Sequence, residues 1–126
     1  MSAPLPTSAE LAILQVLWQR GPSTVRQVHE AQRADRTVGY TTALKLLQIM
    51  YEKGLVRRDG ATRAHTYTAT DEREQVERAL LDDLRARAFG GSAERLVLRA
   101  LGAERASPKD IERIRTLLRR AEEVNP

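Results

Sequence analysis

The residues whose types and spacing best fit a chemical task lie between positions 40 and 63. Thr41, Lys45 and Gln48 stand four and three residues apart, so a helix would place them on one side, with Thr42 at the margin. Hydroxyl, ammonium and amide groups donate to phosphates and reach base edges, as a helix in the major groove of DNA must. The solvent-facing side of any amphipathic helix has a similar composition, so this row alone leaves both interpretations open.

A basic turn follows this helix. Residues 55–58 and 65–69 have the composition of two short strands, and Asp59-Gly60 between them is a turn dipeptide. The arginines around the turn are Arg57, Arg58 and Arg63. Positive charge at the tip of a hairpin fits the DNA backbone beside a groove, although an arginine-rich turn also serves solubility alone. The helix and the hairpin together favour a nucleic-acid-binding surface.

The arrangements that enzymes use are missing from the sequence. There is no cysteine, which excludes disulfides, thiolate metal sites and a cysteine nucleophile. The two histidines, His29 and His65, fall on separate predicted elements, and His65 is expected to pack or to face a phosphate. Gly90-Gly91 is not followed by the lysine of a phosphate-binding loop. We therefore predict a protein that is not an enzyme and has no metal or cofactor.

Two helices are predicted ahead of the one at 40–53, and they must position it. Thr7 and Glu10 form a capping box at the start of the first, which ends at Gly21-Pro22. Ser23 or Thr24 caps the second. The expected core positions are Leu11, Leu14, Leu17 and Trp18, then Val25, Val28 and Ala31, then Ala43, Leu44, Leu47, Met50 and Tyr51. Three helices followed by a hairpin predict a winged helix-turn-helix over residues 1–70.

Three more helices are predicted in residues 71–126. The first opens at a capping box of Asp71 and Glu74, the second is capped by Ser92 and closed by Gly102, and the last begins at Ser107-Pro108. Three amphipathic helices of this size bury little surface alone, so we expect them to pack against a second copy. The expected dimer contacts are Val76, Leu80, Leu84, Leu96, Val97, Leu101, Ile111, Ile114, Leu117 and Leu118. A monomer folded back on residues 1–70 remains the alternative.

Composition agrees with this division. The chain has 126 residues, 41% of them hydrophobic but only 4% aromatic, which favours a mainly α fold. Its net charge of +4 lies wholly in residues 1–70, which hold nine basic against five acidic residues. A basic half joined to a neutral half fits one polyanion-binding module and one module with another role. With no signal region and no apolar run of roughly 18 residues, we expect a cytoplasmic protein without a membrane partner.

Four segments resemble the penicillinase-repressor family of bacterial regulators, which includes the BlaI, MecI and CopY repressors. YTTALKLLQIMYEKGLVRRD and RAHTY are similar to its recognition helix and wing, and FGGSAERLVLRAL and SPKDIERIRTLL to its dimerisation helices. The resemblance implies a homodimeric repressor that binds a palindromic operator in double-stranded DNA until a signal releases it. By position, it places Thr41, Thr42 and Lys45 in the groove and the three turn arginines in the wing.

The sequence also departs from the family at functional positions. Leu44 and Tyr40 stand where beta-lactam-responsive members have arginine and proline, so their operator is not implied. Arg99-Ala100 replaces the Asn-Phe pair at which those members are cleaved. Whether a regulatory protease acts on this protein is therefore an open question. The absence of cysteine excludes thiolate copper sensing. A winged-helix adaptor that binds another protein through its leucine-rich helices is the alternative function.

Overall fold

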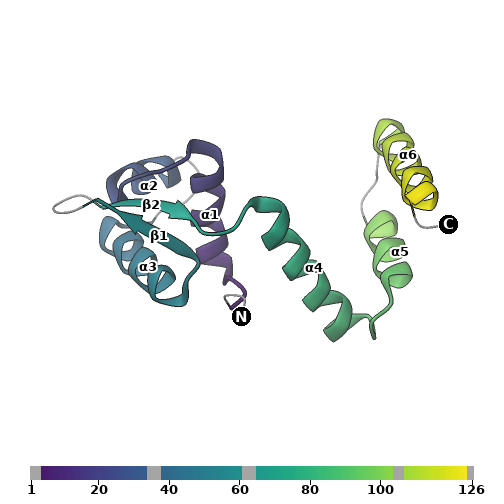
Figure 1. Ribbon diagram of the computed structural model, residues 1–126, viewed down its shortest axis with the longest axis horizontal. Coiled ribbons are helices and arrows are strands. Elements are labelled where there is room, and N and C mark those ends of the chain that lie inside the picture. Colours follow the sequence, from purple (N-terminus) through teal and green to yellow (C-terminus); the bar gives the residue numbers. More distant parts are fainter. Residues whose placement is uncertain (1–3, 34–37, 61–64, 104–106, 125–126) are drawn as a thin grey trace. The chain divides into compact units, whose positions relative to one another are not determined.

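The computed structural model describes residues 4–33, 38–60, 65–103 and 107–124 (Figure 1). Its elements are α1 (Ser8–Arg20), α2 (Val25–Gln32), α3 (Tyr40–Lys53), β1 (Val56–Asp59), β2 (Thr66–Ala69), α4 (Arg73–Ala88), α5 (Ala93–Ala103) and α6 (Pro108–Val124). The chain forms two compact units, Met1–Leu81 and Asp82–Pro126, so the first half of α4 belongs to the first unit. The predicted functional division after residue 70 stays a prediction.

The predicted capping box at the start of α1 is confirmed. The Thr7 hydroxyl accepts from the Glu10 backbone N–H at 3.2 Å, and the Glu10 carboxylate accepts from the Thr7 N–H at 2.9 Å. The buried side of α1 is rotated from the prediction, because Ile13 is fully buried whereas Leu11 and Trp18 are half-buried at the edge of the core. Apolar residues occur almost all round this helix, so their spacing does not define one inward face.

The core of the first unit gathers around one row of α3. Ala43, Leu47 and Met50 have no exposed surface, and they pack with residues of α1, α2 and the hairpin. The predicted core row that ended at Tyr51 is wrong in part, because the Tyr51 side chain is 41% exposed. The Tyr51 ring contacts the guanidinium of Arg58 in the hairpin instead of packing in the core. Gly54 ends α3 in the left-handed region at φ 84°, which glycine adopts without steric cost.

The hairpin is a two-stranded antiparallel sheet in which Val56 pairs with Ala69 and Arg58 with Tyr67. The sequence did not reveal a third pairing. Ser23 and Tyr67 exchange two backbone hydrogen bonds, of 3.0 and 2.8 Å, so the hairpin is attached to the segment that leads into α2. The predicted winged helix-turn-helix fold is thereby confirmed, since three helices and a hairpin form one group (Figure 1).

The start of α4 is built into the first unit. Its cap is not the predicted pair of Asp71 and Glu74; instead the Glu72 N–H donates to the Gln75 side chain at 2.9 Å. Asp71 has another role, because its carbonyl accepts a 3.0 Å hydrogen bond from the Trp18 indole. Val76 is buried in the core of this unit. The helix is therefore fixed to the winged helix at its first turns.

The second unit contains the rest of α4 together with α5 and α6. The predicted caps are confirmed: the Ser92 hydroxyl accepts from the Arg95 N–H and the Ser107 hydroxyl from the Asp110 N–H, both at 3.1 Å. The end of α5 differs from the prediction, since the helix continues through Gly102. Within the residues that the structure describes, no helix is long and apolar enough to cross a membrane.

Candidate nucleic-acid interface

The polar row of α3 lies on the surface, as its spacing predicted. Thr41, Thr42, Lys45 and Gln48 are all exposed, on the side of the helix that the buried row leaves free. Thr41 and Thr42 stand in the first turn, where backbone N–H groups lack partners within the helix. Free N–H groups and a positive helix end both favour a phosphate at such a place. These four residues combine hydrogen-bond donors with one cation, and Glu52, one turn after Gln48, adds an exposed carboxylate at the margin.

Arg58 of the hairpin is held against α3. Its guanidinium carbon lies 4.0 Å from the centre of the Tyr51 ring, a cation–π contact between the two elements. Successive side chains of a strand point to opposite faces, so Arg57 projects from the other face of the hairpin. Arg63, the third predicted wing residue, lies outside the described residues. The structure therefore brings Arg58, and not Arg57, beside the helix.

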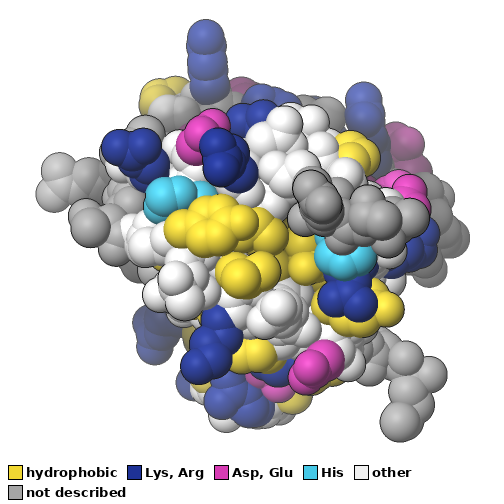
Figure 2. Space-filling view, turned by 90° about the vertical axis from the view of Figure 1, so that its left-hand side faces the viewer, with side chains coloured by type: hydrophobic (Ala, Val, Ile, Leu, Met, Phe, Trp, Pro, Cys, Tyr) yellow, Lys and Arg dark blue, Asp and Glu magenta, His cyan; other side chains and the backbone are white. Residues whose placement is uncertain are grey.

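A groove of about 560 Å³ runs between α2, α3 and the hairpin. Its lining residues are Thr24, Val25 and Arg26 near the start of α2, Tyr40, Leu44 and Gln48 of α3, and Arg58, His65 and Tyr67 of the hairpin. Figure 2 shows hydrophobic side chains in the middle of this face, with lysines, arginines and histidines around them and some acidic side chains among these. The four-residue spacing of Tyr40, Leu44 and Gln48 is the sequence pattern that places these three residues on one side of α3. The sequence analysis assigns Leu44 to the core and Gln48 to the polar row, so it does not predict the groove.

The two histidines occupy different sides of this surface. The His29 ring meets the Tyr40 ring edge-on, with centroids 5.9 Å apart. His65 Nδ1 lies 3.0 Å from the carbonyl oxygen of Gly60 within the hairpin. Among the described residues, no three His, Cys, Asp or Glu side chains gather as metal ligands. His29 therefore packs on an aromatic ring and His65 contacts a backbone carbonyl, while the expectation that His65 packs or faces a phosphate stays a prediction.

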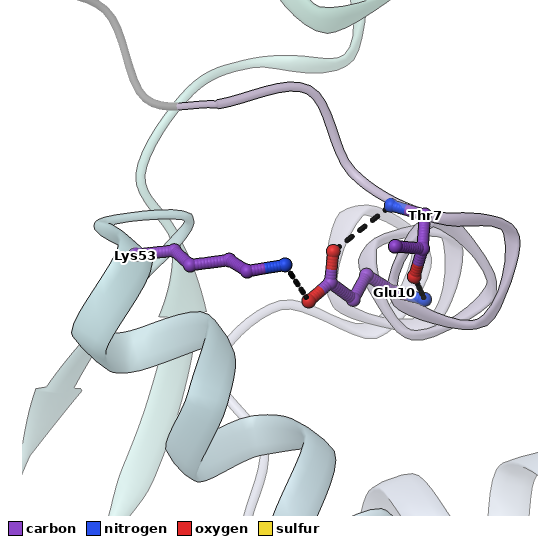
Figure 3. A network of polar contacts seen from close by, with 3 residues as sticks. All are labelled: Thr7, Glu10 and Lys53. Carbon is purple, nitrogen blue, oxygen red and sulfur yellow. Dashed lines mark hydrogen bonds and ion pairs between the residues drawn. The ribbon is translucent and has the colours of Figure 1, made fainter.

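Lys53 at the end of α3 points into the first unit and not toward the groove. Its ammonium lies 2.8 Å from the carboxylate of Glu10 in α1 (Figure 3). Burial raises the pKa of Glu10, but the hydrogen bonds from Lys53 and Thr7 and the Lys53 charge outweigh it, so this pKa lies below its ordinary value of 4.5. The sequence predicted Glu10 as a cap but did not reveal its burial or its partner in α3.

The residues predicted to form the dimer contact fall into two groups. Val76 and Leu80 pack on the core of the first unit. The others lie on later turns, and their side chains are exposed or half-buried in the single chain: Leu84, Leu96, Val97, Leu101, Ile111, Ile114, Leu117 and Leu118. The Leu117 residue has 60% of its surface exposed. Leu98, which the prediction omitted, has 59% of its surface exposed. These apolar side chains are uncovered in the single chain, and their role in a dimer contact stays a prediction.

Two relatives from Mycobacterium tuberculosis strains (CDC 1551 / Oshkosh and ATCC 25618 / H37Rv), each named transcriptional regulator BlaI, are 38% identical to the chain over 90 residues. The alignment covers 71% of this chain and 65% of each relative, so it spans less than two thirds of their length.

Two solved structures resemble the chain in fold. The Bacillus licheniformis BlaI monomer in complex with the blaP half-operator has a TM-score of 0.50 at 20% identity, over 58% of this chain and 89% of that one. Staphylococcus aureus MarR in complex with salicylate and kanamycin has a TM-score of 0.55 at 15% identity, over 94% of this chain and 73% of that one. At these identities the likeness extends to the fold alone.

The match to a family covers nearly the whole chain. The sequence model of the penicillinase repressor family matches residues 6–120, which include every helix of the first unit, the hairpin, α5 and most of α6. Together with the 38% identity to the mycobacterial regulators, this match shows that the chain belongs to the penicillinase repressor family.

Proposed function

We propose that this chain is a homodimeric transcriptional repressor that binds a palindromic operator in double-stranded DNA and leaves it when a signal arrives. The groove provides the main support, because Gln48 of the polar row and Arg58 of the hairpin line it together. Phosphate contacts fix the position of a protein on DNA, and contacts to base edges select the sequence. The interface offers cations for the first task and hydrogen-bonding side chains for the second.

α3 is the element assigned to the major groove. Thr41, Thr42, Lys45 and Gln48 would face the DNA, and Arg58, which lies against the helix, would contact the backbone beside the groove. Arg57, on the other face of the hairpin, and Arg63, which is assigned from the sequence alone, are proposed as further backbone contacts. The family supports this assignment, since its members include regulators, and the Bacillus BlaI structure is a complex with half-operator DNA. The net positive charge of residues 1–70 acts in the same direction, because it attracts a polyanion over a longer distance.

The second unit is assigned to dimerisation. Leu98, Leu117 and their apolar neighbours on α5 and α6 are exposed in the single chain, and a second copy would cover them. A two-fold dimer presents two α3 helices to DNA, which requires two inverted half-sites about one helical turn apart. The repressor is thus expected to select a palindrome.

The experiment is to incubate the purified protein with fragmented genomic DNA at two salt concentrations and to sequence the retained fragments. A repressor of this kind enriches a palindromic site, and its affinity falls steeply with salt because bound phosphates release counterions. Recovery of no enriched sequence, with binding to protein partners that is insensitive to salt, would contradict the proposal. That outcome would favour the adaptor alternative.

A further inference from the structure

The floor of the groove is apolar where α3 lines it. Tyr40 and Leu44 stand one helical turn apart and point into the groove with Gln48. Tyr40 is 46% exposed, and Leu44 is half-buried against the core. These two residues form a row beside Thr41 and Lys45, so the surface that α3 offers to DNA contains an apolar strip next to a polar one.

An apolar strip discriminates between base pairs. In the major groove every base edge presents hydrogen-bond donors or acceptors, and the 5-methyl group of thymine is the apolar feature among them. A guanine or cytosine edge pressed against leucine loses hydrogen bonds to water without receiving new ones. Thymine loses less, because its methyl group is the part that touches the apolar side chain.

The neighbours of the strip hold it in place. The Tyr40 ring is braced edge-on by His29 of α2, and Leu44 is packed on the core behind it. Arg26 and Arg58 line the same groove and provide two cations near the strip, suited to the phosphates that flank a base. Side chains that are already ordered in the free protein lose little conformational entropy when DNA binds.

We propose that Tyr40 and Leu44 form a thymine-reading strip, so that each operator half-site places thymine 5-methyl groups against them. The proposal rests on the proposed function, since it concerns the DNA sequence that the repressor selects. It assigns to Tyr40 and Leu44 a role in specificity, beside the polar contacts assigned to Thr41, Lys45 and Gln48.

The test uses the palindromic duplex recovered from genomic DNA, with each thymine of one half-site replaced singly by uracil. This replacement removes one methyl group and leaves the hydrogen-bonding edge unchanged. Fluorescence anisotropy at constant salt should show that uracil weakens binding about fourfold at one or two positions, the effect of one buried methyl group. Uracil at the other positions should leave the affinity unchanged.

A Leu44→Ala variant connects the effect to this side chain. At the position that leucine contacts, the variant should bind thymine and uracil duplexes equally. Leu5→Ala is the matched control, because Leu5 is an exposed leucine that lines a different groove, with Leu55 and Val76. It should retain the full preference for thymine. Circular dichroism of both variants checks that the fold is intact.

The outcomes separate the two proposals. Tight, sequence-specific binding that tolerates uracil at every thymine would overturn the thymine-reading strip and leave the proposed repressor function intact. A Leu44→Ala variant that keeps the whole preference for thymine would also overturn it. Absence of sequence-specific DNA binding would overturn the proposed function itself, and the strip with it. The uracil scan uses the unaltered protein, so it does not depend on the stability of any variant.

Discussion

The Lys53 ammonium nitrogen lies 2.8 Å from a carboxylate oxygen of Glu10, whose side chain is only 2% exposed. The other carboxylate oxygen of Glu10 accepts from the Thr7 N–H, so both oxygens have partners. This contact ties the end of α3 to the first turn of α1 (Figure 3). It thereby fixes the orientation of the helix that carries the proposed DNA-binding row.

Removal of the lysine should destabilise the first unit. In Lys53→Met the Glu10 carboxylate stays buried without its cation, so we expect the free energy of unfolding to fall by about 1–3 kcal/mol. Adding Glu10→Gln to Lys53→Met should restore part of the loss, because no buried charge then remains. Urea unfolding followed by circular dichroism measures both variants. Lys45→Met, on the exposed side of α3, is the matched control; an equal loss there would contradict a special role for Lys53.

The same pair predicts how stability changes in acid. The pKa of Glu10 lies below 4.5 in the folded chain, so the unfolded chain takes up this proton at a higher pH. The pair therefore stabilises the fold fully above about pH 4.5, and this stabilisation is lost as pH falls through the lowered pKa. Unfolding free energies of wild type and Glu10→Gln, measured from pH 7 to pH 2, should converge in acid. A difference that stays constant over this range would show that the Glu10 charge contributes nothing.

The sequence predicted the type and order of the helices and strands better than it predicted their inward faces. Caps are local, so Thr7, Ser92 and Ser107 could be identified from neighbours within three residues. The partners of Lys53 and of the Trp18 indole lie 43 and 53 residues away, and no local pattern reports such a distance.

Only the part of the candidate interface that depends on local spacing could be predicted from the sequence. The exposed row of α3 follows from helical spacing alone, which is why Thr41, Lys45 and Gln48 are where we expected them. The groove depends on where the hairpin packs. Only the observed register shows that Arg58 faces α3 over Tyr51 while Arg57 faces away.

Loss of cations from the proposed interface should weaken DNA binding without unfolding the protein. Lys45→Ala, and separately Arg57→Ala combined with Arg58→Ala, should each lower operator affinity and reduce the slope of log affinity against log salt by about one per lost phosphate contact. Anisotropy titrations at several salt concentrations give both quantities. Lys109→Ala, an exposed lysine of α6, should change neither. Unchanged affinity in both test variants would contradict the proposed contact surface.

The stack of Arg58 on Tyr51 should matter for binding more than for folding. Tyr51→Leu removes the ring that holds the guanidinium, so Arg58 must be ordered when DNA binds, at a cost of about 0.5–1 kcal/mol. Operator affinity should therefore fall about threefold, whereas Tyr51→Phe keeps the aromatic face and should bind like wild type. If Tyr51→Leu and Tyr51→Phe weaken binding equally, the hydroxyl and not the cation–π contact is responsible.

The apolar side of α6 provides the test of dimerisation. Leu117→Glu places a carboxylate where we propose that a second chain packs, and an unpaired charge in an interface is costly to bury. The dimer dissociation constant should rise at least about thirtyfold, equivalent to roughly 2 kcal/mol. Analytical ultracentrifugation over a range of concentrations measures it.

Thr116→Glu is the matched control, because it adds the same charge one residue away, on the side of α6 where the Thr116 hydroxyl donates to the Glu112 carbonyl. It should leave the dimer intact. Operator affinity at low protein concentration should follow the dimer, since a monomer contacts one half-site only. A Leu117→Glu protein that still sediments as a dimer at wild-type concentrations would exclude this part of α6 from the interface.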